Sequence, residues 1–118
     1  MKSGEINSLF KNLSRVIKNP RSDLKYKNKF TLLVSVVLSA QCTDVNVNNV
    51  TKNIFPKYNK PEHFVKLGRK KIEKLIKSIG LFRNKAKSVY LLSKRLIKKH
   101  NGRVPKNFND LYLSLIHI

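Results

Sequence analysis

The chain has 118 residues, of which 41% are hydrophobic, so it can form one small domain with a core but not two independently folded domains. Lysine and arginine number 26 against 6 aspartate and glutamate residues, which gives a formal net charge of +20 and favours polyanionic partners such as nucleic acid. An AT-rich genome would also raise the lysine content, so the charge suggests this class of partner without identifying it.

Cysteine and histidine content limits the chemistry of the chain. The single cysteine, Cys42, cannot form an internal disulfide, and the three histidines have no metal-ligand spacing with it or with one another. We therefore expect a reducing compartment, a packed thiol at Cys42 and no metal site built from these residues.

One apolar run raises the question of a membrane segment. Residues 31–40 have about half of the length that a membrane-spanning helix needs. The string LSAQC at 38–42 is similar to a lipoprotein cleavage site, but Gln41 occupies the position that needs a small residue, and a long polar segment precedes the run. We expect a cytoplasmic protein, associated with the nucleoid if it binds DNA, and no membrane partner.

Two helices are predicted in the N-terminal third of the chain. Residues 4–18 place apolar side chains three and four positions apart, and Asn19-Pro20 ends this pattern. Residues 30–38 carry apolar side chains on almost all sides, which indicates a buried central helix. The valines of this segment would also suit a β-strand, but no second strand-like run exists for pairing, so a helix is preferred.

Shorter helices are predicted along the rest of the chain. Thr43 or Asp44 can cap the first of them, and Gly68, Gly80 and Gly102 end three later ones. The expected architecture is an all-α bundle of about six or seven short helices joined by short loops. The further predicted helices cover 44–55, 61–67, 69–79 and 84–99, with one more helix start near 108–111.

Three strings occur in order: FTLLVSVVLSAQCTDVNVNNV at 30–50, KSIGLFRNKAKSV at 77–89 and HNGRVPKNFNDL at 100–111. Together they resemble the N-terminal half of endonuclease III, a DNA glycosylase and abasic-site lyase of the helix-hairpin-helix superfamily. In that family a leucine-rich helix runs into SAQ-x-TD, IG-[LFY]-x-x-x-KA opens a later helix, and HNG-x-VP precedes the helix that leads to the hairpin. SAQ-x-TD favours endonuclease III over the adenine glycosylases of the same superfamily.

The resemblance implies base-excision repair of oxidised pyrimidines, with double-stranded DNA that contains damaged bases or abasic sites as the partner. Such enzymes rotate the damaged nucleotide out of the duplex and must fill the gap that it leaves. In the family the glutamine of SAQ fills that gap and the apolar residue after IG wedges into the opposite strand, which points to Gln41 and Leu81 here. Without the resemblance, Gln41 would be an ordinary polar helix end and Leu81 a contact beside the Gly80 cap.

Three further residues are candidate DNA-binding residues. Arg83, Asn84 and Lys85 lie at a predicted helix start, where exposed amides and basic side chains can bind phosphate oxygens. The alternative for each of them is a place on a solvated basic face.

The resemblance also implies chemistry that residues 1–118 do not carry. In the family a lysine nucleophile lies on a hairpin of the form LPG-[VI]-G-x-K-TA, followed by a catalytic aspartate and four cysteines that hold a [4Fe-4S] cluster. No string of this chain matches that region, so we assign no catalytic residue and no metal ligand here. We expect the cluster, and the glycosylase and lyase activities, in the intact family protein and not in this chain.

The expected organisation is a partial glycosylase domain, truncated before the hairpin, over residues 1–112. Its first helix, 1–19, packs in the family on the C-terminal region. Since this chain lacks that region and the hairpin, we expect it to be marginally stable. We also expect it to be a monomer. The terminal LSLIHI at 113–118 is expected to be a non-native tail, with a short genuine helix as the alternative.

A different class of function remains open. A small basic helical module that binds DNA or RNA without catalysis would need only phosphate contacts, and its binding would be salt-sensitive and indifferent to a damaged base. A structural or ribosome-associated basic protein is a third interpretation, supported by composition alone.

Overall fold

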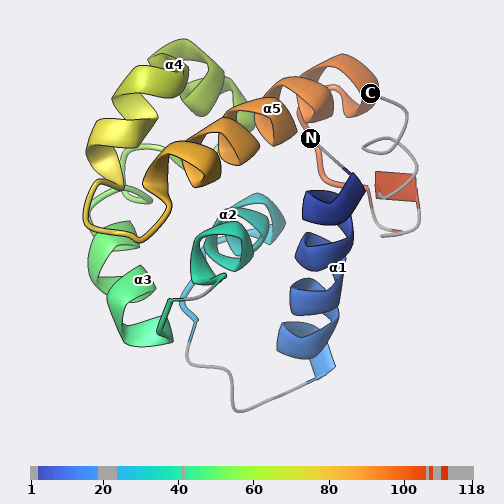
Figure 1. Cartoon of the computed structure of the whole chain (residues 1–118). Helices are drawn as coiled ribbons and strands as arrows, with labels where there is room; N and C mark the ends of the chain where they lie inside the picture. Colours follow the sequence, from blue (N-terminus) through green and yellow to red (C-terminus); the bar gives the residue numbers. More distant parts are fainter. Residues whose placement is uncertain (1–2, 19–23, 41, 106, 108–109, 112–118) are drawn as a thin grey trace.

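The computed structural model describes residues 3–18, 24–40, 42–105, 107 and 110–111. These residues form five α-helices and no β-strand, which confirms the predicted all-α class (Figure 1). The principal extents are 32 × 31 × 25 Å. The helices are α1 (Ser3–Lys18), α2 (Lys29–Ser39), α3 (Asp44–Thr51), α4 (Pro61–Leu75) and α5 (Phe82–His100).

The most apolar segment of the sequence forms the centre of the bundle. Every residue of α2 from Phe30 to Ser39 is buried, and the helix contacts α1, α3 and α5 (Figure 1). The expectation of a central helix is therefore confirmed. The buried hydroxyl of Ser39 donates to the carbonyl of Val36 at 2.8 Å, so this polar group is satisfied within the helix.

A reciprocal cap fixes the start of α2. The Asn28 side chain accepts a hydrogen bond from the backbone N–H of Thr31 at 2.8 Å, and the Thr31 hydroxyl accepts one from the N–H of Asn28 at 2.8 Å. This capping box satisfies two amides that the helix itself leaves without partners.

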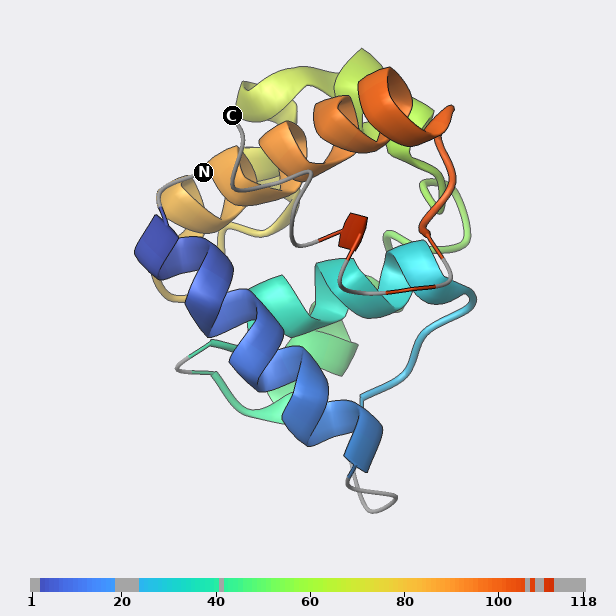
Figure 2. The same cartoon turned by 90° about the vertical axis from the view of Figure 1, so that its right-hand side faces the viewer.

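Helix α1 has a partner within the chain. Its residues Ile6, Leu9 and Leu13 are buried, and the helix packs against α2. Figure 2 shows α1 lying diagonally across one side of the bundle, with α2 behind it. The packing of this helix on the C-terminal region, as in the family, remains a prediction. The side chains of Ile6, Leu9 and Leu13 are already buried by the residues that the structure describes.

Helix α3 differs from its predicted extent. It ends at Thr51, and turns follow it in which the N–H of Phe55 donates to the carbonyl of Thr51 at 2.9 Å. Ile54 and Phe55 are buried all the same. The pattern that predicted a helix over 44–55 therefore identified the buried face correctly but not the end of the helix.

Helices α4 and α5 form the most extensively packed pair of the bundle. Gly68, with φ of 79° and ψ of 160°, interrupts α4, which confirms the predicted end of a helix there. Helix α5 begins at Phe82, two residues before its predicted start, because Leu81 rather than a later residue takes the non-helical conformation. The predicted helix near 108–111 lies largely outside the described residues, and the tail at 113–118 lies outside them entirely.

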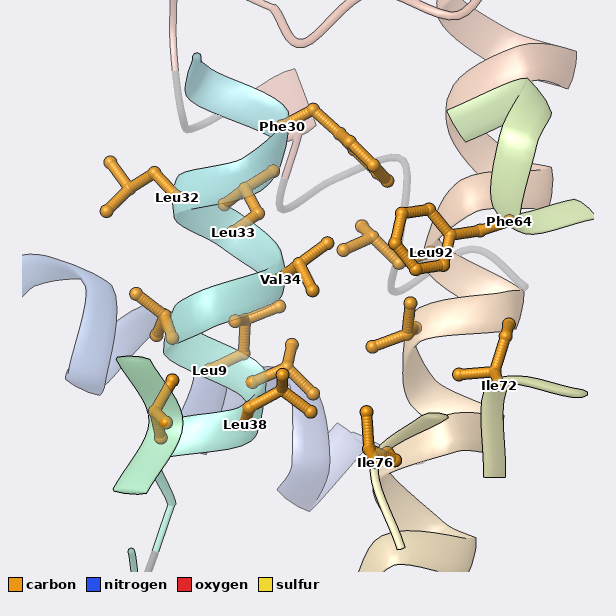
Figure 3. Close-up of a cluster of buried hydrophobic side chains, with 14 of the residues drawn as sticks. Leu9, Phe30, Leu32, Leu33, Val34, Leu38, Phe64, Ile72, Ile76 and Leu92 are labelled. Atoms are coloured by element: carbon orange, nitrogen blue, oxygen red, sulfur yellow. The ribbon is translucent and has the colours of Figure 1, made fainter. Parts of the chain in front are cut away.

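One cluster of buried apolar side chains unites all five helices. Figure 3 shows Phe30 and Val34 of α2 on the side of that helix that faces Phe64 of α4 and Leu92 of α5. Phe30 and Phe64 pack with ring centroids 5.6 Å apart, which ties α2 to α4. The core thereby holds the end of α2 and the start of α5 in a defined arrangement.

Candidate nucleic-acid interface

Two helix ends of the bundle meet at one place, although they are far apart in the sequence. Ala40 follows the last turn of α2, and Leu81 precedes the first turn of α5. A hollow of about 380 Å³ lies beside both of them, between these ends and α1. Its lining is Gly4, Ser8, Leu9, Asn12, Val36, Val37, Ala40, Leu81, Asn84, Lys85 and Ser88. Three of the five predicted DNA-binding residues therefore lie together.

Leu81 combines an unusual backbone with an unusual exposure. Its φ of 58° and ψ of 34° are left-handed, a conformation that costs a non-glycine residue about 1–2 kcal/mol. The residue is 58% exposed, although leucine is normally buried. The sequence predicted an apolar residue at a helix start here, and the structure shows that Leu81 projects from the surface at that point.

Lys85 is placed differently from the expectation. It is only 6% exposed, and its ammonium group donates hydrogen bonds to the carbonyl oxygens of Leu38 at 3.1 Å and Ala40 at 2.6 Å. An exposed lysine free to reach phosphate was expected, whereas this amine caps the end of α2. Burial lowers the pKa of Lys85 below its ordinary value, and the nearby Cys42 opposes that shift.

Arg83 and Asn84 are exposed at the start of α5, as the sequence predicted. The Arg83 guanidinium lies 5.4 Å from the centre of the Phe82 ring, and its Nε is 3.9 Å from a carboxylate oxygen of Glu73. Its side chain is 78% exposed, so neither contact removes it from solvent. Both residues lie in the first turn of α5, directly after Leu81.

Gln41 lies outside the described residues, but the residues after it are defined. The N–H of Cys42 donates to the carbonyl of Ser39 at 3.1 Å, and the Cys42 sulfur accepts from the Asn46 side chain at 3.1 Å. The Thr43 hydroxyl accepts from the N–H of Asn46 at 3.2 Å and caps α3, while Asp44 is in the first turn. Of the two caps that the sequence allowed, the structure selects Thr43.

Helix α1 contributes to this site in a way that the sequence pattern did not predict. Ser8 and Asn12 line the hollow from α1. They lie four positions apart, so they share one helix face next to the buried Leu9. That spacing was the available signal, but only the packing of α1 on α2 shows which face borders the hollow.

A second hollow of about 320 Å³ is separate from this site. It is lined by Val65 of α4 and by Leu91, Lys94, Arg95, Ile97 and Lys98 of α5. Of the four predicted DNA-binding residues that the structure describes, Leu81, Arg83, Asn84 and Lys85, none lines it.

The residues described do not fit an iron–sulfur cluster. Such a cluster takes several thiolate ligands, whereas the chain has one cysteine, whose sulfur is engaged with Asn46. In the part of the chain that the structure describes, no three histidine, cysteine, aspartate or glutamate side chains gather as metal ligands do.

None of the helices found among the described residues is both long and apolar enough to cross a membrane.

Comparison with known proteins confirms the resemblance carried by the three strings. The model of a family described as HhH-GPD superfamily base excision DNA repair protein matches residues 34–115. An endonuclease III of Rickettsia prowazekii is 46% identical over 111 residues, which cover 94% of this chain and 52% of that protein. An endonuclease III of Bacillus subtilis is 47% identical over 89 residues, which cover 75% of this chain and 41% of that protein.

Solved structures show the same fold. An endonuclease III trapped with DNA as a covalent intermediate superimposes with a TM-score of 0.74 and 39% identity, over 94% of this chain and 52% of that one. A non-covalent endonuclease III–DNA complex superimposes with a TM-score of 0.73 and 38% identity, over 93% of this chain and 51% of that one. A thermostable thymine-DNA glycosylase, at 23% identity and a TM-score of 0.70, shares the fold. The chain spans about half the length of the curated relatives that match along most of it.

Proposed function

We propose, since this chain belongs to the HhH-GPD superfamily of base excision DNA repair proteins, that an intact protein containing it is a DNA glycosylase with abasic-site lyase activity. Its substrates would be oxidised pyrimidines and abasic sites in double-stranded DNA. The observation that carries the proposal is Leu81, an exposed leucine in a left-handed conformation beside the end of α2.

The proposed role of Leu81 follows from the energetics of base flipping. Moving a nucleotide out of a duplex costs a few kcal/mol of lost stacking, and that loss must be recovered at the gap. An apolar side chain can replace stacking surface without needing a hydrogen-bond partner. Gln41 would act from the other helix end, where an amide can both donate to and accept from the orphaned base.

The same surface suits the phosphates that flank a damaged site. Arg83 offers an exposed guanidinium, and Asn84 lies beside it in the first turn of α5. That turn holds no acidic residue, so its unpaired amides and the positive end of the helix dipole also favour an anion.

Residues 1–118 by themselves would bind DNA as a monomer, in association with the nucleoid, without cleaving it. Schiff-base chemistry needs a lysine amine positioned at the sugar, and the family's hairpin motif for that lysine does not occur in this sequence. The [4Fe-4S] cluster of the family would likewise be held by other residues of an intact protein.

A duplex with a tetrahydrofuran abasic analogue, compared with the same duplex undamaged, tests the binding proposal by fluorescence anisotropy. The wild-type chain should prefer the abasic duplex. Leu81→Gly should lose about tenfold of that affinity, because the lost burial of a leucine side chain corresponds to a factor of that order.

Asn101→Gly is the matched control, since Asn101 has the same left-handed backbone, with φ of 53°, at the other end of α5. It should leave the preference unchanged. Equal affinity of the wild-type chain for both duplexes would contradict the proposal. It would favour the second candidate function, a non-catalytic basic module that binds nucleic acid, which the net charge of +20 supports.

A further inference from the structure

Among the residues whose burial the structure describes, Lys85 is the one buried residue with a charged side chain. A lysine is almost never buried unless it has specific partners, because removing an ammonium group from water is costly. The surrounding contacts give a reason for its presence.

The side chain of Lys85 completes the end of α2. The last carbonyls of a helix have no partner within it, and α2 has neither a glycine cap nor a basic residue in its last turn. The Lys85 amine supplies the missing hydrogen-bond donor, because it binds the carbonyls of Leu38 and Ala40. The negative end of the helix dipole also favours a cation at this place.

The backbone of the same residue holds the start of α5. The N–H of Lys85 donates to the carbonyl of Leu81 at 3.0 Å, which closes the first turn behind the left-handed leucine. One residue therefore bonds to both helix ends: its main chain to Leu81 and its side chain to Ala40, whose positions in the sequence are far apart.

We propose that Lys85 is a positioning residue, a clamp between the end of α2 and the start of α5 that holds Leu81 in one orientation toward DNA. This inference rests on the proposed function, because it gives Lys85 the role of positioning Leu81 as the wedge and not the role of binding a phosphate. An apolar residue of the same length would fill the space but leave the carbonyls of Leu38 and Ala40 without this partner. The orientation of Leu81 relative to α2 would then depend on packing alone.

The test compares Lys85→Met and Lys85→Arg with Lys94→Met in the full chain. Lys94 is an exposed lysine later on the same helix, so its replacement removes the same charge. Two duplexes are used, undamaged and abasic, each with 2-aminopurine beside the site, whose fluorescence rises when the bases unstack. Lys85→Met should lose about tenfold of the preference for the abasic duplex, together with the fluorescence rise. Lys85→Arg should restore part of both, and Lys94→Met should retain them.

Amide hydrogen exchange without DNA tests the clamp directly. Lys85→Met should speed exchange at Cys42 and Lys85, whose N–H groups bond to Ser39 and Leu81, more than at the core of α2. Ile72→Val, a mild destabilisation of the core away from the clamp, should not do so selectively.

The outcomes separate the two proposals. A wild-type chain without any preference for the abasic duplex would overturn the proposed function, and the role of Lys85 would fall with it. A wild-type preference that Lys85→Met retains in full, with unchanged exchange at Cys42 and Lys85, would overturn the clamp alone. If Ile72→Val lost the preference equally, or if Lys85→Arg rescued nothing, Lys85 would be a general stability residue.

If Lys85→Met does not fold, Lys85→Arg and the exchange pattern of the wild-type chain still test the clamp. Fast exchange at the amides of Cys42 and Lys85 in the wild-type chain would contradict it.

Discussion

Leu81 and Lys85 are four positions apart at the start of α5, yet the leucine is exposed and the lysine is buried. This reversal of the usual preferences requires compensation at each residue. For Lys85 the compensation is the pair of carbonyls at the end of α2, and for Leu81 it is the proposed contact with DNA.

Replacing Lys85 by methionine should change how stability depends on pH. Burial lowers the pKa of Lys85 in the folded chain below the ordinary lysine value of 10.5, whereas unfolding restores that value. Between the two values the unfolded chain binds more protons, so this group's contribution to the free energy of unfolding rises with pH. The urea midpoint of the wild-type chain should therefore rise relative to that of Lys85→Met as the pH increases toward 10.5. A constant difference between the two midpoints would contradict the lowered pKa.

Helix α2 illustrates how an element can depend on residues outside it. Its start is fixed locally, by the capping box of Asn28 and Thr31, whereas its end is fixed by Lys85, far along the sequence. The apolar composition of α2 ensures that the helix is buried, but burial alone does not satisfy the amides and carbonyls at its ends. Both caps are therefore needed to place this helix.

Asn28→Ala tests the contribution of the first cap. The substitution removes the acceptor for the N–H of Thr31 and should lower the free energy of unfolding by about 1 kcal/mol, measured by urea denaturation. Asn49→Ala, on an exposed position of α3, should change it by no more than about 0.5 kcal/mol. Equal effects of the two substitutions would show that the capping box contributes nothing specific.

The overall charge of the chain is poorly neutralised. There are 26 basic and 6 acidic residues, and Glu73 is near two arginines, 4.0 Å from Arg69 and 3.9 Å from Arg83. At such distances on the surface these pairs contribute little to stability. The excess of cations is therefore available to attract a polyanion.

Binding to undamaged duplex DNA should weaken steeply with salt, because each neutralised phosphate releases a counterion. The logarithm of affinity should fall by about 0.9 per phosphate contact for each tenfold rise in salt. Arg83→Ala should reduce that slope by about one contact. Arg69→Ala is the control, since Arg69 neighbours the same carboxylate but belongs to α4 and not to the first turn of α5. Equal slopes for the wild-type chain and Arg83→Ala would remove Arg83 from the phosphate-binding residues.

Local patterns in the sequence were sufficient to predict the all-α class, the central position of α2 and the break at Gly68. Helical periodicity, apolar runs and glycine act within a few residues, so these features need no knowledge of distant contacts. The three strings also identified the family, since their combination and order are specific to it. The choice of Leu81 as a candidate, and the exposure of Arg83 and Asn84, could therefore be predicted from the sequence.

The surroundings of these residues depend instead on how the helices pack. The sequence places Lys85 in a row of basic and polar residues, where it resembles a solvated lysine. Its burial is set by the packing of α5 on α2, and its partners, Leu38 and Ala40, lie 47 and 45 positions away. Ser8 and Asn12 border the hollow for the same reason, through the packing of α1 on α2. Periodicity shows which residues share a helix face, but the neighbour of that face depends on contacts between distant parts of the chain, which no local pattern contains.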